Sequence, residues 1–576
     1  MKKLFVFLAL LVVFALAVAC GSSDDNGTPD QPVATPPPAN DGANDAGDYG
    51  EVEDPADDQE DPVPVAEGQE IVFALHNTFT TIDPGISNNS FAAEILSNTF
   101  EGLVTFDTTD GSIIPGQAES WTVSDDGRVW TFILREGLRW SDGSDLTAYD
   151  FEWAWRRVLT PETLSAQTTS FTNYIYNAQE FFDGEVGEDE LGVRAVDART
   201  FEVTLINPTG FFLDVIVAWQ FSPVQRATVE THGDRWTLEA ENFIGNGPFR
   251  LTEINIGHSI VMERNPYYRD ANNVHLDRVI FRYIEDLATA LLAFEAGEID
   301  GSRSVIAGEI PRLRVDNAGI VTIPGLGTTF YSVNVERYPL DNVYVREALA
   351  LALDRYTIIN DVLQTPATFA SGVVPPGFSL DGRDFVNGRV DVGIRANANV
   401  EGAQAALARA GYPNGEGFPP LEMHFWTNDN ARRIAEAMAE MWITNLNIEV
   451  IILNEEWPVL YETRLQPGEF YVAATGWGGG FAHPMAFLPT YRTGDVNNLS
   501  RYSNPELDAL IAEAMAETDP HRAFDLMQQA DDIITSQFVT IPIHHGHNVM
   551  LMRPGVQGFW LTPSNLLFLR NARVVD

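Results

Sequence analysis

A single cysteine in a chain of 576 residues limits how this protein can hold its fold together. With Cys20 as the only thiol, no disulfide can form within the chain, so burial of apolar side chains must supply the stability. The composition suits this, because 45% of the residues are hydrophobic and 11% are aromatic. The length exceeds what one compact core usually contains and predicts about two to four domains.

The first 20 residues have the pattern of an export signal. Two lysines precede an apolar run over residues 4–19, which is shorter than the roughly 20 residues of a membrane-spanning helix. The AVAC that ends at Cys20 resembles a bacterial lipobox, although Leu usually stands where this chain has Ala17. We expect residues 1–19 to be a signal peptide and Cys20 to carry lipid, which explains an unpaired cysteine. The alternative is a plain secretory signal with an incidental cysteine.

Residues 20–68 are expected to be a lipidated, disordered acidic linker. They are rich in Pro, Gly, Asp and Glu, contain no Lys or Arg, and have too few large apolar residues to offset the entropy of ordering. Such a tether would hold a globular part near a membrane through the lipid anchor. We therefore expect an exported protein at the outer face of the cytoplasmic membrane, on the cell surface or in the periplasm.

The charge and the reactive residues exclude several classes of function. A formal net charge of −47 argues against nucleic acid, whose phosphates require a basic face. No lysine follows Lys3, so a catalytic lysine is excluded in the mature chain. Neither a G-x-S-x-G elbow nor an H-E-x-x-H pair occurs. The sequence therefore predicts no enzyme and no cofactor.

Apolar spacing beyond residue 69 predicts mixed α and β structure. The runs EIVFALH and RVWTFIL favour strands at 70–76 and 128–134, and Thr147 with Asp150 forms a capping pair that should open a helix. Asn447 should end a later helix in the left-handed conformation, just before the strand IEVIIL. Apolar residues recur at helical spacing in 345–363, 431–446, 505–518 and 522–537.

Several motifs occur in an order that is more specific than any one of them. They are TIDPG, EGLVTFD, the run from PGQAESW to TAYDF, LGVRAVDARTFEVTL, NGPFRL, ERNPYY, VREALALALDR, NEEW, GW and YSNPELDALIAEA. This set closely resembles the oligopeptide-binding family of ABC-importer solute receptors, known as family 5 extracellular solute-binding proteins. The resemblance covers about residues 70 to 570.

The resemblance implies an α/β receptor with a two-lobed, periplasmic-binding-protein-like fold that closes on its ligand about a hinge. Lobe I, with an extra subdomain inserted, would comprise 69–325 plus 538–576, and lobe II would comprise 326–537. The partners would be a peptide or other small solute and the permease and ATPase subunits of an ABC importer. A monomer is expected.

The stretch TGWGGGFAHPMAFL at 475–488 raises the question of a phosphate loop. It has no Gly-Lys-Ser/Thr, and its glycines do not match G-x-G-x-x-G, so both nucleotide interpretations are weak. The resemblance implies a pocket wall here. Gly480 stands where related receptors usually have an Asp that pairs with the peptide amino terminus, and His483 stands where an acid is common. Ala474 replaces one Arg that some relatives direct at the peptide carboxylate, while Arg464 survives at a second such place.

Aromatic residues take the place of the lost charge in the expected pocket. Trp426, Trp457 and Trp477 are the main candidates for ligand contact, with Phe481 beside them, because aromatic faces stack on apolar groups or sugar rings. One or more of them could instead fill the core of lobe II, above all Trp457. Gly478 to Gly480 would let backbone groups approach a ligand.

Histidines form the remaining candidate contacts. His544 and His545 lie in IPIHHGHNV, and with His483 they should hydrogen-bond a ligand as neutral imidazoles. They lack the acidic or thiolate companions of a strong metal site, so no metal site is assigned and binding of a metal chelate remains an alternative. The leading hypothesis is capture of an oligopeptide or similar solute. The alternatives are the same receptor for an oligosaccharide or other uncharged solute, or an adhesion or signalling lipoprotein.

Overall fold

The computed structural model describes residues 68–575. The predicted signal peptide, lipidated Cys20 and most of the acidic linker lie outside the described residues. Within residues 68–575, no helix combines the length and the apolar character needed to cross a membrane.

A mixed sheet of eleven strands organises the described part of the chain. Ten of them follow the order β17 (Val450–Glu455), β16 (Leu421–Trp426), β18 (Val472–Gly478), β12 (Ile320–Val333), β19 (Thr540–Met552), β11 (Gly301–Ser302), β1 (Glu70–Leu75), β10 (Arg278–Tyr283), β9 (Ser259–Arg264), β8 (Phe249–Asn255). The eleventh strand, β13 (Thr368–Phe369), pairs with β19. A separate four-stranded sheet has the order β4 (Ala118–Val123), β5 (Val129–Leu134), β7 (Thr200–Thr204), β6 (Val193–Ala195).

Helices surround both sheets. Those that precede β12 in the chain are α1 (Ser90–Thr99), α2 (Ala148–Leu159), α3 (Thr168–Thr172), α4 (Ala178–Phe182), α5 (Phe212–Ile216), α6 (Arg226–His232), α7 (Leu287–Ala296) and α8 (Ile310–Val315). Those that follow β12 are α9 (Val343–Leu351), α10 (Arg355–Thr357), α11 (Val400–Arg409), α12 (Asp429–Leu446), α13 (Trp457–Leu460), α14 (Pro505–Ala516) and α15 (Pro520–Ser536).

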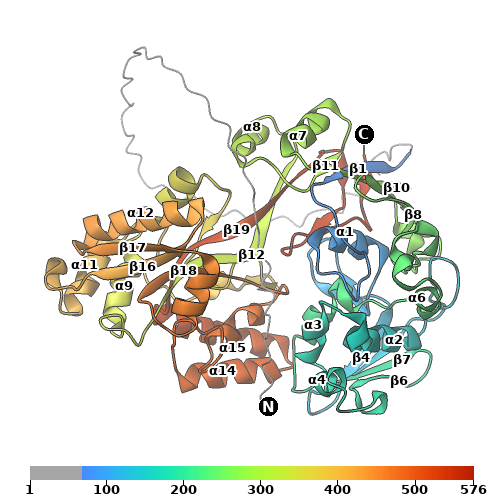
Figure 1. The fold of residues 1–576 in the computed structure, drawn as a ribbon, viewed down its shortest axis with the longest axis horizontal. Coiled ribbons are helices and arrows are strands. Elements are labelled where there is room, and N and C mark those ends of the chain that lie inside the picture. The colour runs from blue at the N-terminus through green and yellow to red at the C-terminus, as the bar shows by residue number, and fades with distance from the viewer. Residues whose placement is uncertain (1–67, 576) are drawn as a thin grey trace, which may run out of the picture. The chain divides into compact units, whose positions relative to one another are not determined.

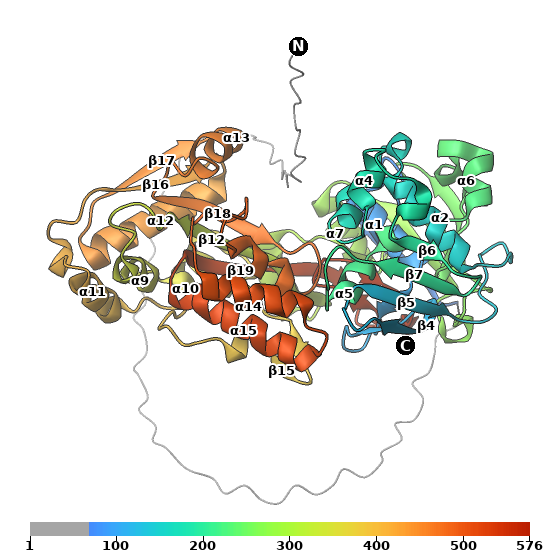
Figure 2. The ribbon, with the colours of Figure 1, turned by 90° about the horizontal axis from the view of Figure 1, so that it is seen from below.

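Strands β12 and β19 pair antiparallel and form what we call the ribbon. They are the longest strands of the sheet, and Figure 1 shows them running side by side between β18 and β11. On one side the ribbon carries the β16 group, which consists of β16, β17, β18 and α9 to α15. On the other side it carries the β1 group, which consists of β1, β8 to β11, the four-stranded sheet and α1 to α8 (Figure 2).

The ladder of the ribbon is interrupted at its middle. Pro324 pairs with His547 and Thr328 pairs with His545, so residues 325–327 lie opposite a single residue of β19. An insertion of this kind breaks the ladder and bends the strand locally. The ribbon is therefore irregular at its centre, and a second register shift follows between Thr329 and Phe330.

Burial of apolar side chains supplies the core, as the lack of disulfides requires. One cluster fills the β1 group and continues into α14 and α15, while a second packs β16, β18 and the helices around them. Trp155 and Trp442 are among the largest fully buried side chains, and each indole N–H donates to a backbone carbonyl. Such pairing removes the cost of burying a polar N–H.

Most predicted elements are confirmed. Strands β1 and β5 form at the two predicted apolar runs. At the start of α2, the N–H of Thr147 donates to the carboxylate of Asp150. Asn447 ends α12 with φ of 53°, in the left-handed region, before β17. Helices α14 and α15 match the last two predicted segments.

The single helix expected over residues 345–363 is wrong. Helix α9 ends at Leu351, α10 begins at Arg355, and residues 358–363 continue as a π-helix. Arg355 is fully buried and donates from its guanidinium to the carbonyl oxygens of Ala350 and Pro542. This side chain lies at the end of α9, and at the break Asp354 accepts the N–H of Thr357 and so caps the start of α10.

Candidate functional site

The carboxyl ends of two sets of parallel strands are directed toward the middle of the ribbon. β18 runs antiparallel to β12, and its last residue, Gly478, pairs with Gly327 at the interruption. β11 runs antiparallel to β19, and Ser302 pairs with Leu551, so this strand approaches the interruption from the other end. β16 and β17 are parallel to β18, and β1 and β10 are parallel to β11. Ligands of open α/β sheets bind outside such carboxyl ends, so this region is the candidate site.

Two tryptophans from the predicted set meet at the carboxyl end of the β16 group. Trp426 is the last residue of β16 and Trp457 the first of α13, and their rings lie edge to face with centroids 5.8 Å apart. Tyr461 continues the cluster at 5.6 Å from Trp457. Both tryptophans are half-buried, so each ring packs on its neighbours and also presents a surface to solvent.

Arg464 lies beside this aromatic cluster and already has an acidic partner. Its Nε donates to Oε1 of Glu455 at 2.9 Å. The other oxygen, Oε2 of Glu455, is buried without a hydrogen bond, and Nδ1 of buried His424 lies 3.7 Å from it. Burial lowers the pKa of His424 against the opposing effect of Glu455, so the imidazole tends to be neutral. A ligand carboxylate at Arg464 would have to share it with Glu455.

The stretch at 475–488 combines a fixed tryptophan with exposed glycines. The indole N–H of Trp477 donates to the carbonyl oxygen of Ala486 at 2.7 Å. The only polar group of this side chain is therefore bonded within the loop. Gly478 and Gly480 are exposed, and a Cβ added at either would contact nothing within 4 Å. Gly479 differs, because a Cβ there would lie 2.9 Å from the ring of Phe487. Only the first and third glycines of the run therefore face open space.

Phe481 and His483 contact the β1 group. Their rings lie nearly parallel to that of Phe211, with centroids at 5.5 Å and 5.3 Å. Nδ1 of His483 accepts the N–H of Met485, and burial lowers the pKa of this histidine to about 3. The imidazole is therefore neutral in the physiological range, and its hydrogen bond and ring contact lie within the protein, so its contact with a ligand stays a prediction.

The histidines of the ribbon differ in their surroundings. Thr328 donates its hydroxyl proton to the carbonyl oxygen of Val373, so it accepts from Nδ1–H of His545, and this histidine is a buried part of the ribbon. Burial lowers the pKa of His544 to about 4, and the nearby His547 adds to the effect. The buried Nδ1 atoms of His544 and His547 have no hydrogen-bond partner. Over residues 68–575, no cluster of His, Cys, Asp and Glu is placed to hold a metal ion.

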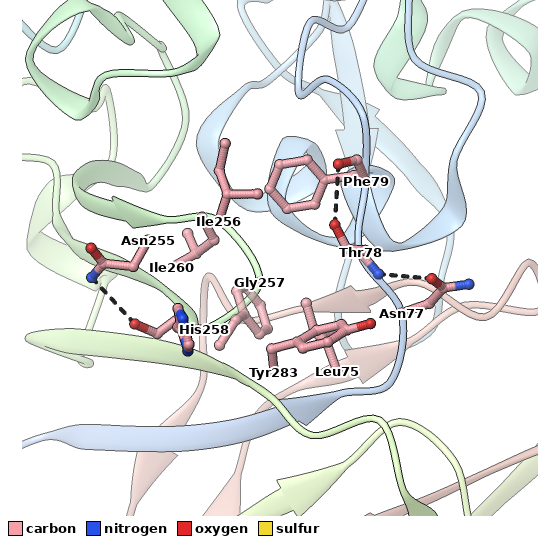
Figure 3. Close-up of a pocket in the computed structure, with 12 residues that line it drawn as sticks. Leu75, Asn77, Thr78, Phe79, Asn255, Ile256, Gly257, His258, Ile260 and Tyr283 are labelled. Carbon is pink, nitrogen blue, oxygen red and sulfur yellow. Dashed lines mark hydrogen bonds between the residues drawn. The ribbon is translucent and has the colours of Figure 1, made fainter.

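A hollow at the carboxyl ends of β1 and β10 was not predicted from the sequence. It is a shallow hollow with about 300 Å³ of free space, open solvent included. Figure 3 shows Phe79 and Ile256 above it and Leu75 and Tyr283 below, from the loop after β1, the β8–β9 turn and the two strand ends. The signal in the sequence is only that strands β1 and β10 end here, which requires knowledge of their pairing.

The loop that leads from β1 into this hollow is held by His76. Its Nδ1 bonds to the carbonyl oxygen of Ile284 at 2.7 Å and its Nε2 to Oγ of Ser302 at 2.9 Å. The three residues follow or end the three parallel strands of the β1 group, so one side chain ties all three ends together. Burial lowers the pKa of His76, which agrees with a neutral ring that both donates and accepts.

Comparison with known proteins gives consistent matches. The family described as bacterial extracellular solute-binding proteins, family 5 Middle, matches residues 112–498. The chain is 32% identical to the periplasmic oligopeptide-binding protein OppA of Salmonella typhimurium, over 89% of this chain and 94% of that one. It is 33% identical to the probable deoxycholate-binding periplasmic protein YgiS of Escherichia coli, over 86% and 91%.

Solved structures match the same part of the chain. The unliganded open form of the murein tripeptide-binding protein MppA has a TM-score of 0.82 at 31% identity and covers 89% of this chain and 99% of its own. Haemophilus influenzae OppA in complex with the peptide RPPGFSPFR has a TM-score of 0.61 at 30% identity, over 89% and 100%. Because identity and coverage are nearly equal, the higher score indicates that the described residues are arranged more like the unliganded open form.

Proposed function

The chain belongs to family 5 of the bacterial extracellular solute-binding proteins, and on this premise we propose that it captures oligopeptides and delivers them to an ABC importer. The observation that carries the proposal is the placement of Trp426, Gly478 and the hollow beside Phe79 at strand ends directed toward the middle of one ribbon. The relatives named for oligopeptides support a peptide ligand.

In this proposal the β1 group corresponds to lobe I and the β16 group to lobe II. The interruption at residues 325–327, near the expected boundary at 325/326, is where we place the hinge, because residues outside the β12–β19 ladder absorb rotation between these strands more easily than paired ones. Ligand contacts made by both lobes exist only after closure, so the ligand shifts the balance between open and closed states. No bond is made or broken.

Anchoring by lipid at Cys20 and action as a monomer complete the proposal. A receptor that feeds a membrane transporter must stay near it, and the acidic linker supplies reach. Two acyl groups or more would be needed for a stable anchor.

Calorimetry of the purified protein against a panel of peptides of two to five residues tests the peptide ligand. We expect saturable binding, with a negative heat-capacity change from burial of apolar surface. Absence of binding by every peptide at millimolar concentration would exclude oligopeptides as the ligand class.

An uncharged or apolar solute is the second candidate. The exposed Gly480 and the pairing of Arg464 with Glu455 favour it. For such a ligand, Trp426→Ala should weaken binding about 10-fold through loss of an aromatic contact, while Arg464→Ala should leave the dissociation constant nearly unchanged. A large loss on Arg464→Ala would identify a ligand with a carboxylate instead. Isothermal titration of both variants with the same ligand decides between the two candidates.

A further inference from the structure

Phe211 joins the two groups of elements at a point outside the ribbon. It is 5% exposed and immediately precedes α5 in the β1 group. Its ring is almost parallel to that of Phe481, at an interplanar angle of 5°, and to that of His483, at 19°. Phe481 and His483 belong to the loop that follows β18, so this cluster of three rings connects the β1 group with the β16 group.

The backbone beside Phe211 makes the contact tight. The N–H of Gly210 donates to the carbonyl oxygen of Met515 at 3.0 Å, at the end of α14. A Cβ at Gly210 would lie 1.9 Å from the carbonyl oxygen of Glu517, so only glycine permits this approach. The two groups therefore meet here backbone to backbone, as well as through the rings.

The loop at the candidate site is thus held from both groups. At its start, Gly479 donates its N–H to the carbonyl oxygen of Leu326 in β12, and Trp477 bonds within the loop. At its end, the Phe211 contact holds Phe481. Exposed Gly480 lies between these attachments. The place of this loop therefore depends on how the β1 and β16 groups are arranged.

We propose that Phe211 sets ligand affinity from outside the ligand site, by stabilising the unliganded arrangement. The described arrangement is more like an unliganded open form than like the peptide complex of Haemophilus influenzae OppA, and it contains the contact. Closure about residues 325–327 moves one group against the other, and rings that come from the two groups part unless they lie on the rotation axis. A ligand must then displace the contact in order to close the receptor, which lowers its apparent affinity.

The inference rests on the proposed function. It predicts that loss of the Phe211 contact tightens ligand binding, whereas damage to the fold would weaken it. Phe211→Ala removes a contact of the open arrangement, so it should tighten the binding of trialanine about three- to ten-fold, as expected for loss of an aromatic pair. Phe211→Tyr keeps the ring and should bind as the wild type does. The matched control is Phe212→Leu, because Phe212 packs on Trp130 within the β1 group alone.

A second pair of variants perturbs the contact without removing apolar surface. Gly210→Ala forces the backbone of α14 away, and it should also tighten trialanine binding. Gly187→Ala is its control, since a Cβ there meets nothing within 4 Å. Both are measured by calorimetry, with thermal unfolding to verify that each variant is folded.

A measurement without ligand separates the inference from the proposed function. With Cys20 replaced by serine, dyes on cysteines introduced at exposed Glu185 and Glu416 report the distance between the groups by single-molecule energy transfer. The fraction of molecules in the minor state should rise about three- to ten-fold in Phe211→Ala. An unchanged fraction, or unchanged or weaker binding in both variants, overturns the role of Phe211. Failure of the wild type to bind any peptide, with the fraction shifted, contradicts only the peptide ligand.

Discussion

Replacement of Arg303 by methionine is expected to lower the free energy of unfolding by about 3–5 kcal/mol, because it leaves a buried carboxylate without its counter-charge. Arg303 follows β11 and pairs with Glu94 of α1, and these side chains are 7% and 1% exposed. The guanidinium also lies over the ring of Phe91, at 5.1 Å. The second oxygen of Glu94 accepts the N–H of Leu567, so the pair connects three distant segments.

The pH dependence of this loss follows from the same pair. Burial raises the pKa of Glu94, while Arg303 opposes the shift. Without Arg303 the pKa of Glu94 rises further. Between the ordinary pKa of a glutamate and this raised value, the folded state keeps a proton that the unfolded state has released. Stability of Arg303→Met should therefore fall as pH rises from 5 to 8, and denaturant titrations at both values measure it. The double variant Glu94→Gln, Arg303→Met should recover much of the loss. Equal losses at both pH values would contradict this account.

Local rules explain which elements the sequence predicted correctly. Asn447 ends a helix because its own backbone tolerates the left-handed region, and Thr147 with Asp150 opens one through adjacent groups. The break in residues 345–363 has one local signal, because Asp354 accepts the N–H of Thr357 and caps α10. The burial of Arg355 and its bond to the carbonyl of Pro542 have none, because only the tertiary fold brings that carbonyl near.

In the candidate site, too, some residues could be placed from local sequence signals and others could not. Trp426 and Gly478 stand at strand ends, and their place follows from the order of strands and turns in the sequence. The roles of Phe211 and His76 depend on segments that are far apart in the chain, and neither residue belongs to a motif. The ligand-contact roles of the predicted residues stay predictions, although the structure adds that Phe481 and His545 already have partners within the protein.

The absence of an acid at Gly480 leads to a gain-of-function prediction. The resemblance to oligopeptide receptors implies that an Asp in this position pairs with the amino terminus of the peptide. Gly480 is exposed, its φ is not positive, and a Cβ would meet nothing within 4 Å, so Gly480→Asp should cost little stability. Because the pair is exposed, a new bond to an ammonium group would contribute about 0.5–1 kcal/mol, or about two- to five-fold in affinity.

The comparison that isolates this bond uses trialanine with a free and an acetylated amino terminus. Gly480→Asp should tighten the binding of the free peptide alone, and Gly480→Asn, which has the same shape without the charge, should not distinguish the two. Isothermal titration of wild type and both variants with each peptide at low ionic strength gives the six dissociation constants, and added salt should reduce the gain because it screens an exposed pair. If both peptides bind Gly480→Asp and wild type alike, the amino terminus of the ligand lies elsewhere. The aromatic surface of Trp426 and Trp457 would then be the main determinant of binding, because the guanidinium of Arg464 is already paired with Glu455.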